Sequence, residues 1–417
     1  MNASKAGTRL PFPDTFMQFR RMRISNGLIA LSAVLCLGAA SAENDYAAAA
    51  RDLDATIAKQ YAYLEKLPDG QLPDSDLLTS EREAVNDGLT LLAYAEKRIT
   101  SLADHHAITG SSFSNSWAVV PTYADLWIVN RDGRFIVDAV RESSPAANAG
   151  ISVGDAIVAI EGTPTRQAVA EFWEALGLSA TPTREEYAAR VLVAGRRDRA
   201  RKITVQNRSG RVRELVLNSM YDEEQEARPP ISICDLERFT VVRFNNSLGE
   251  FASIEAFDQA MKTIPKDHAL VLDLRDTPSG GNTTVARAVM GWFVTEGEAY
   301  QVHNRPAEER ETGVPRQWIE QVLPREGKYR SSLPTILVGR WTGSMGEGIA
   351  VGFDALGAEV LGTRMAGLKG SIEDLRVGDT NLSVKLPTER LLTVAGLPRE
   401  EFVPRDPPSD ILVPGSC

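Results

Sequence analysis

The stretch that decides the fold runs Thr335-Ile336-Leu337-Val338-Gly339-Arg340-Trp341-Thr342-Gly343-Ser344-Met345-Gly346-Glu347-Gly348-Ile349-Ala350. Its apolar first part predicts a buried strand, and a helix is expected from Met345 to Leu356. Ser344 therefore lies in a strand-to-helix turn, where a serine is most often a helix N-cap. The surrounding glycines also allow a tight turn that exposes the side chain, so a nucleophile is the alternative. The turn is not the hydrolase elbow GxSxG, because Thr342 stands two residues before the serine.

Strands and helices alternate from Phe239 onward, which is the pattern of an α/β layer. The turn after the second strand carries the glycine pair Gly280-Gly281. We expect one α/β domain over 230–417. Its predicted strands are 239–244, 269–274, 335–339 and 358–362, and its predicted helices are 254–261, 285–294 and 345–356.

The region 43–115 is predicted to be helical. Apolar side chains at Leu53, Ile57, Tyr61 and Leu64 fall on one helical face. Ser80 and Glu83 have the spacing of a capping box, which predicts the start of a second helix there.

A β-rich domain is expected over 122–220. Short alternating runs, such as 156–160 and 203–205, are separated by Gly and Asn turns. The charged stretch 171–201, which is rich in arginine near its end, is expected to be an insertion in this domain.

Composition and charge narrow the functional classes. The chain has 417 residues, of which 43% are hydrophobic, and this length allows two or three domains with a sizeable core. The net charge of −10, with no basic block to offset it, argues against a nucleic-acid partner. No CxxC, HExxH or other metal-ligand spacing is present, so we expect neither a metal site nor a cofactor. The oligomeric state is left open.

The first 42 residues have the features of a signal peptide. Arg20, Arg21 and Arg23 precede the apolar segment 28–37, which ends in Ala40-Ser41-Ala42. We expect a mature chain that begins at Glu43, without a membrane span, in the periplasm or outside the cell. Cys234 and Cys417 then remain, and an oxidising compartment would allow them to form a disulfide.

The string Ser144-Pro145-Ala146-Ala147-Asn148-Ala149-Gly150-Ile151-Ser152-Val153-Gly154-Asp155-Ala156-Ile157 resembles a PDZ domain of the bacterial protease type. This resemblance implies peptide binding by strand addition at a sheet edge. The sequence departs from the pattern where a Gly-rich loop normally receives a C-terminal carboxylate. Ala124-Asp125-Leu126-Trp127-Ile128 stands there, and Asp125 would repel a carboxylate.

Three elements follow in a fixed order: Asp273-Leu274-Arg275 with Gly280-Gly281, then Ser344 with Glu347, then Lys369. In this order, behind a PDZ-like domain, they resemble the C-terminal processing (tail-specific) serine peptidases. The resemblance implies a multidomain α/β protein, with a crotonase-like (ClpP-like) peptidase core, a PDZ β-domain and an N-terminal helical segment. It also implies a protein or peptide substrate.

The resemblance assigns roles to these residues. Ser344 would be the nucleophile, and Lys369, which follows it by 25 residues, the general base. A lysine base needs a lowered pKa, and the residues around Lys369 from Met365 to Gly370 include no acid. The backbone N–H of Met345 and one of Gly280 or Gly281 would form the oxyanion hole. Glu347 would orient the site or be purely structural, and Asp273 would be a structural carboxylate.

A second candidate base is His106. The run Asp104-His105-His106 resembles the Asp-x-His element of the tricorn-like branch of the family, in which a late glutamate, here Glu400, supports the histidine. A histidine needs no large change of pKa to act near neutral pH. His268 and His303 have no such context and are expected at the surface.

A second functional class also fits the sequence. Non-catalytic relatives of this core bind apolar ligands, and a PDZ-like domain could hold peptides without cleaving them. The sequence leaves open an exported serine endopeptidase with a lysine base, the same enzyme with a histidine base, and a binding protein.

Overall fold

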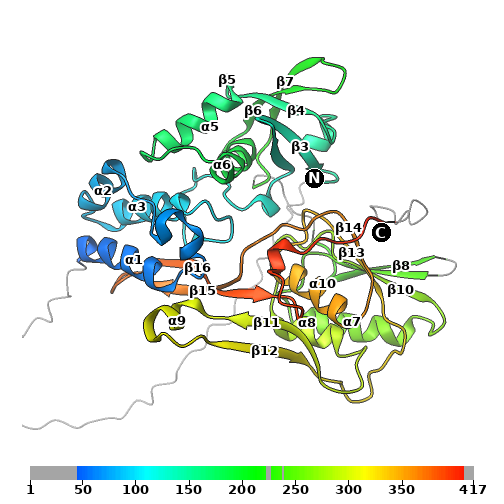
Figure 1. The fold of residues 1–417 in the computed structure, drawn as a ribbon. Coiled ribbons are helices and arrows are strands. Elements are labelled where there is room, and N and C mark those ends of the chain that lie inside the picture. Colours follow the sequence, from blue (N-terminus) through cyan, green and yellow to red (C-terminus); the bar gives the residue numbers. More distant parts are fainter. Residues whose placement is uncertain (1–44, 222–226, 237–238, 408–417) are drawn as a thin grey trace, which may run out of the picture. The chain divides into compact units, whose positions relative to one another are not determined.

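The computed structural model describes residues 45–221, 227–236 and 239–407 (Figure 1). The expected signal peptide, its cleavage site and Cys417 lie outside these residues, so those predictions are not tested. Within the described ranges, no helix combines the length and the apolar character needed to cross a bilayer.

The N-terminal part of the described chain is helical. It contains α1 (Tyr46–Gln60), α2 (Asp76–Glu83) and α3 (Gly88–Ser101), with two short 3₁₀ turns, η1 (Leu64–Lys66) and η2 (Pro68–Gly70). Leu53 and Ile57 of α1 are fully buried, as their spacing predicts. The capping box at Ser80 and Glu83 is wrong, because both lie inside α2, and α3 is instead capped by Asp87 with Thr90.

The next domain is an antiparallel sheet with the strand order β2-β3-β4-β6-β7, so that β2 and β7 form its edges, and β5 pairs with β4. The expected insertion at 171–201 is mainly one helix, α6, which packs along β2. The elements are η3 (Pro121–Tyr123), β2 (Leu126–Arg131), β3 (Arg134–Val140), α4 (Pro145–Asn148), β4 (Ala156–Ile160), β5 (Thr163–Pro164), α5 (Thr165–Glu174), α6 (Pro182–Ala194), β6 (Arg201–Gln206) and β7 (Val212–Leu217).

The predicted α/β layer is a five-stranded sheet with the order β14-β13-β10-β9-β8. Its first four strands are parallel, and β8 pairs antiparallel with β9. The elements are β8 (Ile231–Leu236), β9 (Phe239–Phe244), α7 (Ala252–Thr263), β10 (Ala269–Asp273), α8 (Thr283–Met290), β13 (Thr335–Val338), α10 (Met345–Ala355) and β14 (Val360–Gly362).

The main core lies between one face of this sheet and the helices α7, α8 and α10 (Figure 1). Alternate strand residues point into it, such as Leu272 and Ile336, while their neighbours Val271 and Leu337 face the other side. The helix predicted for 285–294 is wrong at its end, because α8 stops before Gly291.

A further sheet was not predicted as a unit. Its order is β1-β16-β11-β12, and β15 pairs with β16. Apolar residues of β16 also pack against the N-terminal helices, which ties the two ends of the chain together. The elements are β1 (Ile108–Thr109), β11 (Glu298–Asn304), α9 (Pro306–Thr312), β12 (Gln317–Val322), β15 (Ser371–Arg376), β16 (Ser383–Leu392) and η4 (Arg399–Glu401).

Candidate active site

Ser344 occupies the turn between β13 and α10 in an unusual backbone conformation. Its φ is +49° and its ψ is −109°. The N-caps Ser75, Ser144 and Asn282 all have extended backbone instead. Sparsely populated conformations of this kind cost about 1–3 kcal/mol and concentrate at functional sites. Ser344 is the N-cap of α10 and its N–H donates to Glu347 as in a capping box, but its backbone differs from that of these three caps.

Gly280 lies directly against Ser344. Its φ is +64°, and a Cβ added to it would lie only 2.5 Å from the Ser344 Cβ and 3.0 Å from the Met345 nitrogen. Glycine is needed there because the φ is positive and because there is no room for a Cβ. The contact joins the turn after β10 to the turn after β13, and these strands are parallel neighbours whose carboxyl ends share one sheet edge.

Three backbone N–H groups are candidate oxyanion donors at the Ser344 turn. The Gly280 N–H donates to the Thr277 carbonyl at 3.1 Å, so it serves the turn itself. For the N–H groups of Met345 and Gly281, no acceptor is recorded in the described part of the chain. Met345 is the first residue of α10, where N–H groups lack partners within the helix.

Glu347 links the Ser344 turn to the loop 363–370. Its carboxylate is fully buried and accepts from the N–H groups of Ser344 (2.9 Å), Gly367 (2.8 Å) and Leu368 (3.2 Å). Burial raises the pKa of Glu347 to about 7, although the charge of Arg399 and these hydrogen bonds act in the opposite direction. Glu347 thus positions backbone on both sides of the candidate nucleophile.

Lys369 follows the segment that Glu347 holds. Its Nζ lies 4.0 Å from Asp104 Oδ2 and 5.6 Å from the centroid of the Tyr63 ring, and 30% of its side chain is exposed. The expectation of acid-poor surroundings is wrong, because Asp104 approaches from a distant part of the sequence. Lys369 is not in the carboxylate-free environment expected for a neutral lysine base.

His106 is buried beside Lys369. Its Nδ1 lies 2.7 Å from the Lys369 carbonyl oxygen, and its backbone N–H donates to Asp104 Oδ1 at 2.9 Å. Because a carbonyl only accepts, the ring must donate through Nδ1–H, which leaves the Nε2 lone pair available. Burial lowers the pKa of His106 to about 4, against the opposing effect of its hydrogen bond to Lys369. The imidazole is therefore neutral at neutral pH.

Asp104 is the shared partner of this cluster. It is 2% exposed and accepts a hydrogen bond of 2.7 Å from the Tyr61 hydroxyl, in addition to the contacts with His106 and Lys369. Sequence reasoning assigned no role to Tyr61 or Tyr63 here, because both lie about 40 residues upstream and their spacing carries no signal.

Glu400 lies next to Tyr63, whose ring is close to Lys369. Its Oε2 is buried, with no hydrogen-bond partner in the described part of the chain. Burial raises the pKa of Tyr63, and the charge of Glu400 adds to this, so the two side chains are neighbours. The structure records no contact between the described side chains of Glu400 and His106. The adjacent Arg399, which the sequence did not single out, donates to the carbonyls of Leu368 and Gly370 at 3.0 Å each.

The β-rich domain contacts the loops of this site directly. Trp127 of β2 packs against Ala366 and Leu368. Trp341, three residues before Ser344 in the chain, donates through Nε1 to the Ala124 carbonyl at 2.8 Å. The loop expected to receive a carboxylate is thus part of the wall around the candidate nucleophile.

Asp125 in that loop does not face a ligand. It is fully buried, pairs with Arg201, and accepts from the Ala146 N–H at 3.0 Å. Its charge is therefore satisfied inside the domain. The structure does not present it to an incoming carboxylate.

Strand β2 lies at the edge of its sheet, and side chains of α6 cover that edge. The Asn130 N–H donates to Glu186 at 3.1 Å, and Arg190 Nε donates to the Ile128 carbonyl at 2.9 Å. These are backbone groups that a ligand strand would need. Strand addition at β2 therefore requires these α6 side chains to move.

A cavity of about 790 Å³ opens beside Lys369. Its lining includes Asp104, Leu368 and Lys369 from the site and Glu186 and Arg190 from α6. Its volume is within the range of ligand-binding pockets, so there is room for a substrate segment next to the cluster.

The expectation that His303 lies at the surface is wrong. It is 7% exposed and lies between Glu389 (2.9 Å) and Glu320 (3.1 Å). Burial lowers its pKa, but the hydrogen bonds to the two glutamates outweigh this and raise the pKa to about 9. His268 is partly buried and contacts Thr240. Asp273 is fully buried and bound by Arg275, which fits a structural carboxylate.

Comparison with known proteins agrees with this geometry. Residues 239–402 match peptidase family S41, and residues 126–228 match the PDZ domain. The chain therefore combines a peptidase domain of family S41 with a PDZ domain. It is a serine-type peptidase, which implies a protein substrate.

Solved structures share the fold over most of the chain. The photosystem II D1 C-terminal processing protease is 16% identical, with a TM-score of 0.54 over 89% of this chain and 95% of that one. Mature CPAF is 14% identical, with a TM-score of 0.54 over 86% of this chain and 92% of that one. Among curated protein sequences, no significant match was found. At these identities the likeness concerns the fold alone.

Proposed function

We propose that this peptidase is an exported serine endopeptidase in which Ser344 is the nucleophile. The observation that carries the proposal is the strained Ser344 backbone with Gly280 packed against it. We assign the Met345 N–H, which directly follows the nucleophile, and the Gly281 N–H, which follows Gly280, as the donors to the tetrahedral intermediate.

We assign the general base to His106 rather than to Lys369. The neutral imidazole has its Nδ1 proton held by the Lys369 carbonyl, which leaves Nε2 free to accept a proton. Lys369 instead has a carboxylate neighbour and is partly exposed. The chain of contacts from His106 through Lys369, Leu368 and Glu347 to Ser344 supports a common site.

The reaction then follows the general scheme of serine peptidases. Nε2 of His106 takes the Ser344 hydroxyl proton while Oγ attacks the peptide carbonyl. The imidazolium returns the proton to the leaving amine as the C–N bond breaks. A water molecule, deprotonated by the same imidazole, hydrolyses the acyl-enzyme and releases the acid and the free serine.

Variants in a single assay test these assignments. With an unfolded protein as substrate, Ser344→Ala and His106→Asn should each lose at least about 10³-fold in kcat/KM. Lys369→Met should retain activity within about tenfold, since its carbonyl still binds His106. Thermal unfolding of each variant controls for misfolding. If folded Lys369→Met is as inactive as Ser344→Ala while His106→Asn stays active, lysine is the base.

Export is the second part of the proposal. It is supported by the signal-like segment 1–42. N-terminal sequencing of the protein from its native cell should give Glu43 as the first residue. An intact N-terminus on cytoplasmic protein would contradict it.

A further inference from the structure

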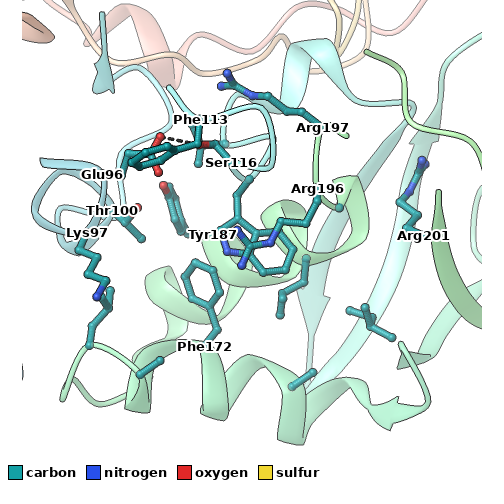
Figure 2. Close-up of a pocket in the computed structure, with 18 of the residues that line it drawn as sticks. Glu96, Lys97, Thr100, Phe113, Ser116, Phe172, Tyr187, Arg196, Arg197 and Arg201 are labelled. Atoms are coloured by element: carbon teal, nitrogen blue, oxygen red, sulfur yellow. Dashed lines mark hydrogen bonds between the residues drawn. The ribbon is translucent and has the colours of Figure 1, made fainter. Parts of the chain in front are cut away.

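A cavity of about 710 Å³ lies away from Ser344, between α3, the segment 108–119 and the helices α5 and α6 (Figure 2). Its volume is within the range of about 300–1,000 Å³ that is typical of small-ligand sites. None of the residues assigned above to nucleophile, base or oxyanion hole lines it. Tyr187 lines both this cavity and the one beside Lys369, so helix α6 separates the two.

Four aromatic side chains contribute to the walls of this cavity. Figure 2 shows Phe113, Phe172 and Tyr187 around it, and Trp117 completes the set. Trp117 and Phe172 meet edge to face, with ring centroids 6.1 Å apart. Such rings offer a large apolar contact area to a ligand that leaves water.

Three arginines of the segment 196–199 add positive charge to these walls. Arg196, Arg197 and Arg199 line the cavity, and no described carboxylate lies within ion-pair distance of any of them. Arg196 lies over the Trp117 ring, with 4.0 Å from its Cζ to the centroid, and its Nε is buried without a hydrogen-bond partner. The Nε of Arg197 is likewise buried and unpartnered.

Three glutamates also line the cavity, and each accepts a hydrogen bond from a neutral group. Glu96 accepts from Ser116, Glu161 from the Lys202 N–H, and Glu171 from Gln167. Burial and the charge of Arg199 lower the pKa of the Arg196 guanidinium, and the charges of Asp198 and Glu96 oppose this. The cavity thus combines apolar walls with three arginines for which no ion pair is recorded in the described part of the chain.

We propose that this cavity binds a ligand in which an apolar group carries a terminal carboxylate. The rings take the apolar group, and the guanidinium groups of Arg196 and Arg197 bind the carboxylate. A free aliphatic acid and the C-terminus of a peptide with an apolar last residue share this chemistry. The site is independent of the assignment of Ser344.

Calorimetry on the full mature chain carrying Ser344→Ala tests the proposal without turnover. The probes are decanoate and N-acetyl-Leu-Phe, each compared with its uncharged counterpart, decanol or the dipeptide amide. At least one acid should bind, at least about tenfold more tightly than its uncharged counterpart. Binding by decanoate alone assigns the site to aliphatic acids, and binding by the dipeptide alone assigns it to peptide C-termini. If neither acid binds, the proposal is wrong.

Matched variants locate the binding. Arg196→Gln should weaken it about tenfold or more, and Ala168→Trp, which fills the cavity, should abolish it. Arg211→Gln removes an equal charge from an exposed position outside the cavity and should leave binding unchanged. Unfolding curves confirm that each variant is folded. Equal affinity of folded Arg196→Gln, folded Ala168→Trp and the parent protein would overturn the assignment.

Discussion

Replacing Gly280 with alanine should inactivate the enzyme without unfolding it. The added Cβ would lie 2.5 Å from the Ser344 Cβ, whereas carbon atoms in contact are about 3.5–4.0 Å apart. The two residues would therefore have to separate by about 1 Å. A misplacement of this size at a reacting group can cost about 10²-fold in rate.

The oxyanion donors add to this loss. The same Cβ would lie 3.0 Å from the Met345 nitrogen, so it would also disturb the N–H assigned to the oxyanion. Loss of one such donor costs about 10²–10³-fold in kcat. We expect Gly280→Ala to lower kcat by at least about 10²-fold, measured on an unfolded protein substrate.

Gly313 provides a matched control. Its φ of +73° is close to that of Gly280, but a Cβ there would have nothing within 4 Å. Gly313→Ala should lose about 1 kcal/mol of unfolding free energy, because alanine is strained at positive φ, and should keep full activity. If both variants are equally active, Gly280 does not position the catalytic turn and the reasoning fails.

Three other outcomes follow from the same contacts. With His106 as the base, kcat/KM should fall as His106 becomes protonated near pH 4, separately from any step near pH 7 that Glu347 causes, whereas a rise that continues into alkaline pH would favour Lys369. Because His106 has a lowered folded pKa, native stability also falls as the pH drops from 6.5 toward 4, so unfolding must be followed in parallel. His303 has a raised folded pKa, so its stabilising contribution is complete below pH 6.5 and is lost as the pH rises through about 9. Chemical denaturation should show that this pH-dependent loss, about 3 kcal/mol at most, is absent in His303→Gln, and an identical pH dependence in both proteins would refute it. Glu186→Ala frees the Asn130 N–H at the β2 edge and should tighten binding of an extended peptide to the Ser344→Ala protein, and unchanged affinity would show that α6 does not limit access.

Local patterns in the sequence predicted the framework of the site. The apolar run before Ser344 and the helix after it correspond to β13 and α10, and the glycine pair lies in the turn after β10. These features depend on neighbouring residues, for which apolar periodicity and turn chemistry are informative. The capping box at Ser80 failed because a second local signal, Asp87 with Thr90, starts α3 instead.

The side chains that surround the candidate bases could not be predicted from the sequence. Asp104 meets Lys369 across more than 260 residues, and only the folded chain shows that the loop around Lys369 has an acidic neighbour. His303 was misjudged for the same reason, because Glu320 and Glu389 reach it from other strands of its sheet. Such pairings depend on strand order, which periodicity does not reveal.

Labelling with a fluorophosphonate tests the role of Ser344 most directly. The reagent reacts only with a serine that is activated as a nucleophile, and mass spectrometry identifies the residue that carries it. We predict a single adduct on the peptide that contains Ser344, and its loss in folded Ser344→Ala. A protein that stays unlabelled, or an adduct that persists in Ser344→Ala, would contradict the assignment.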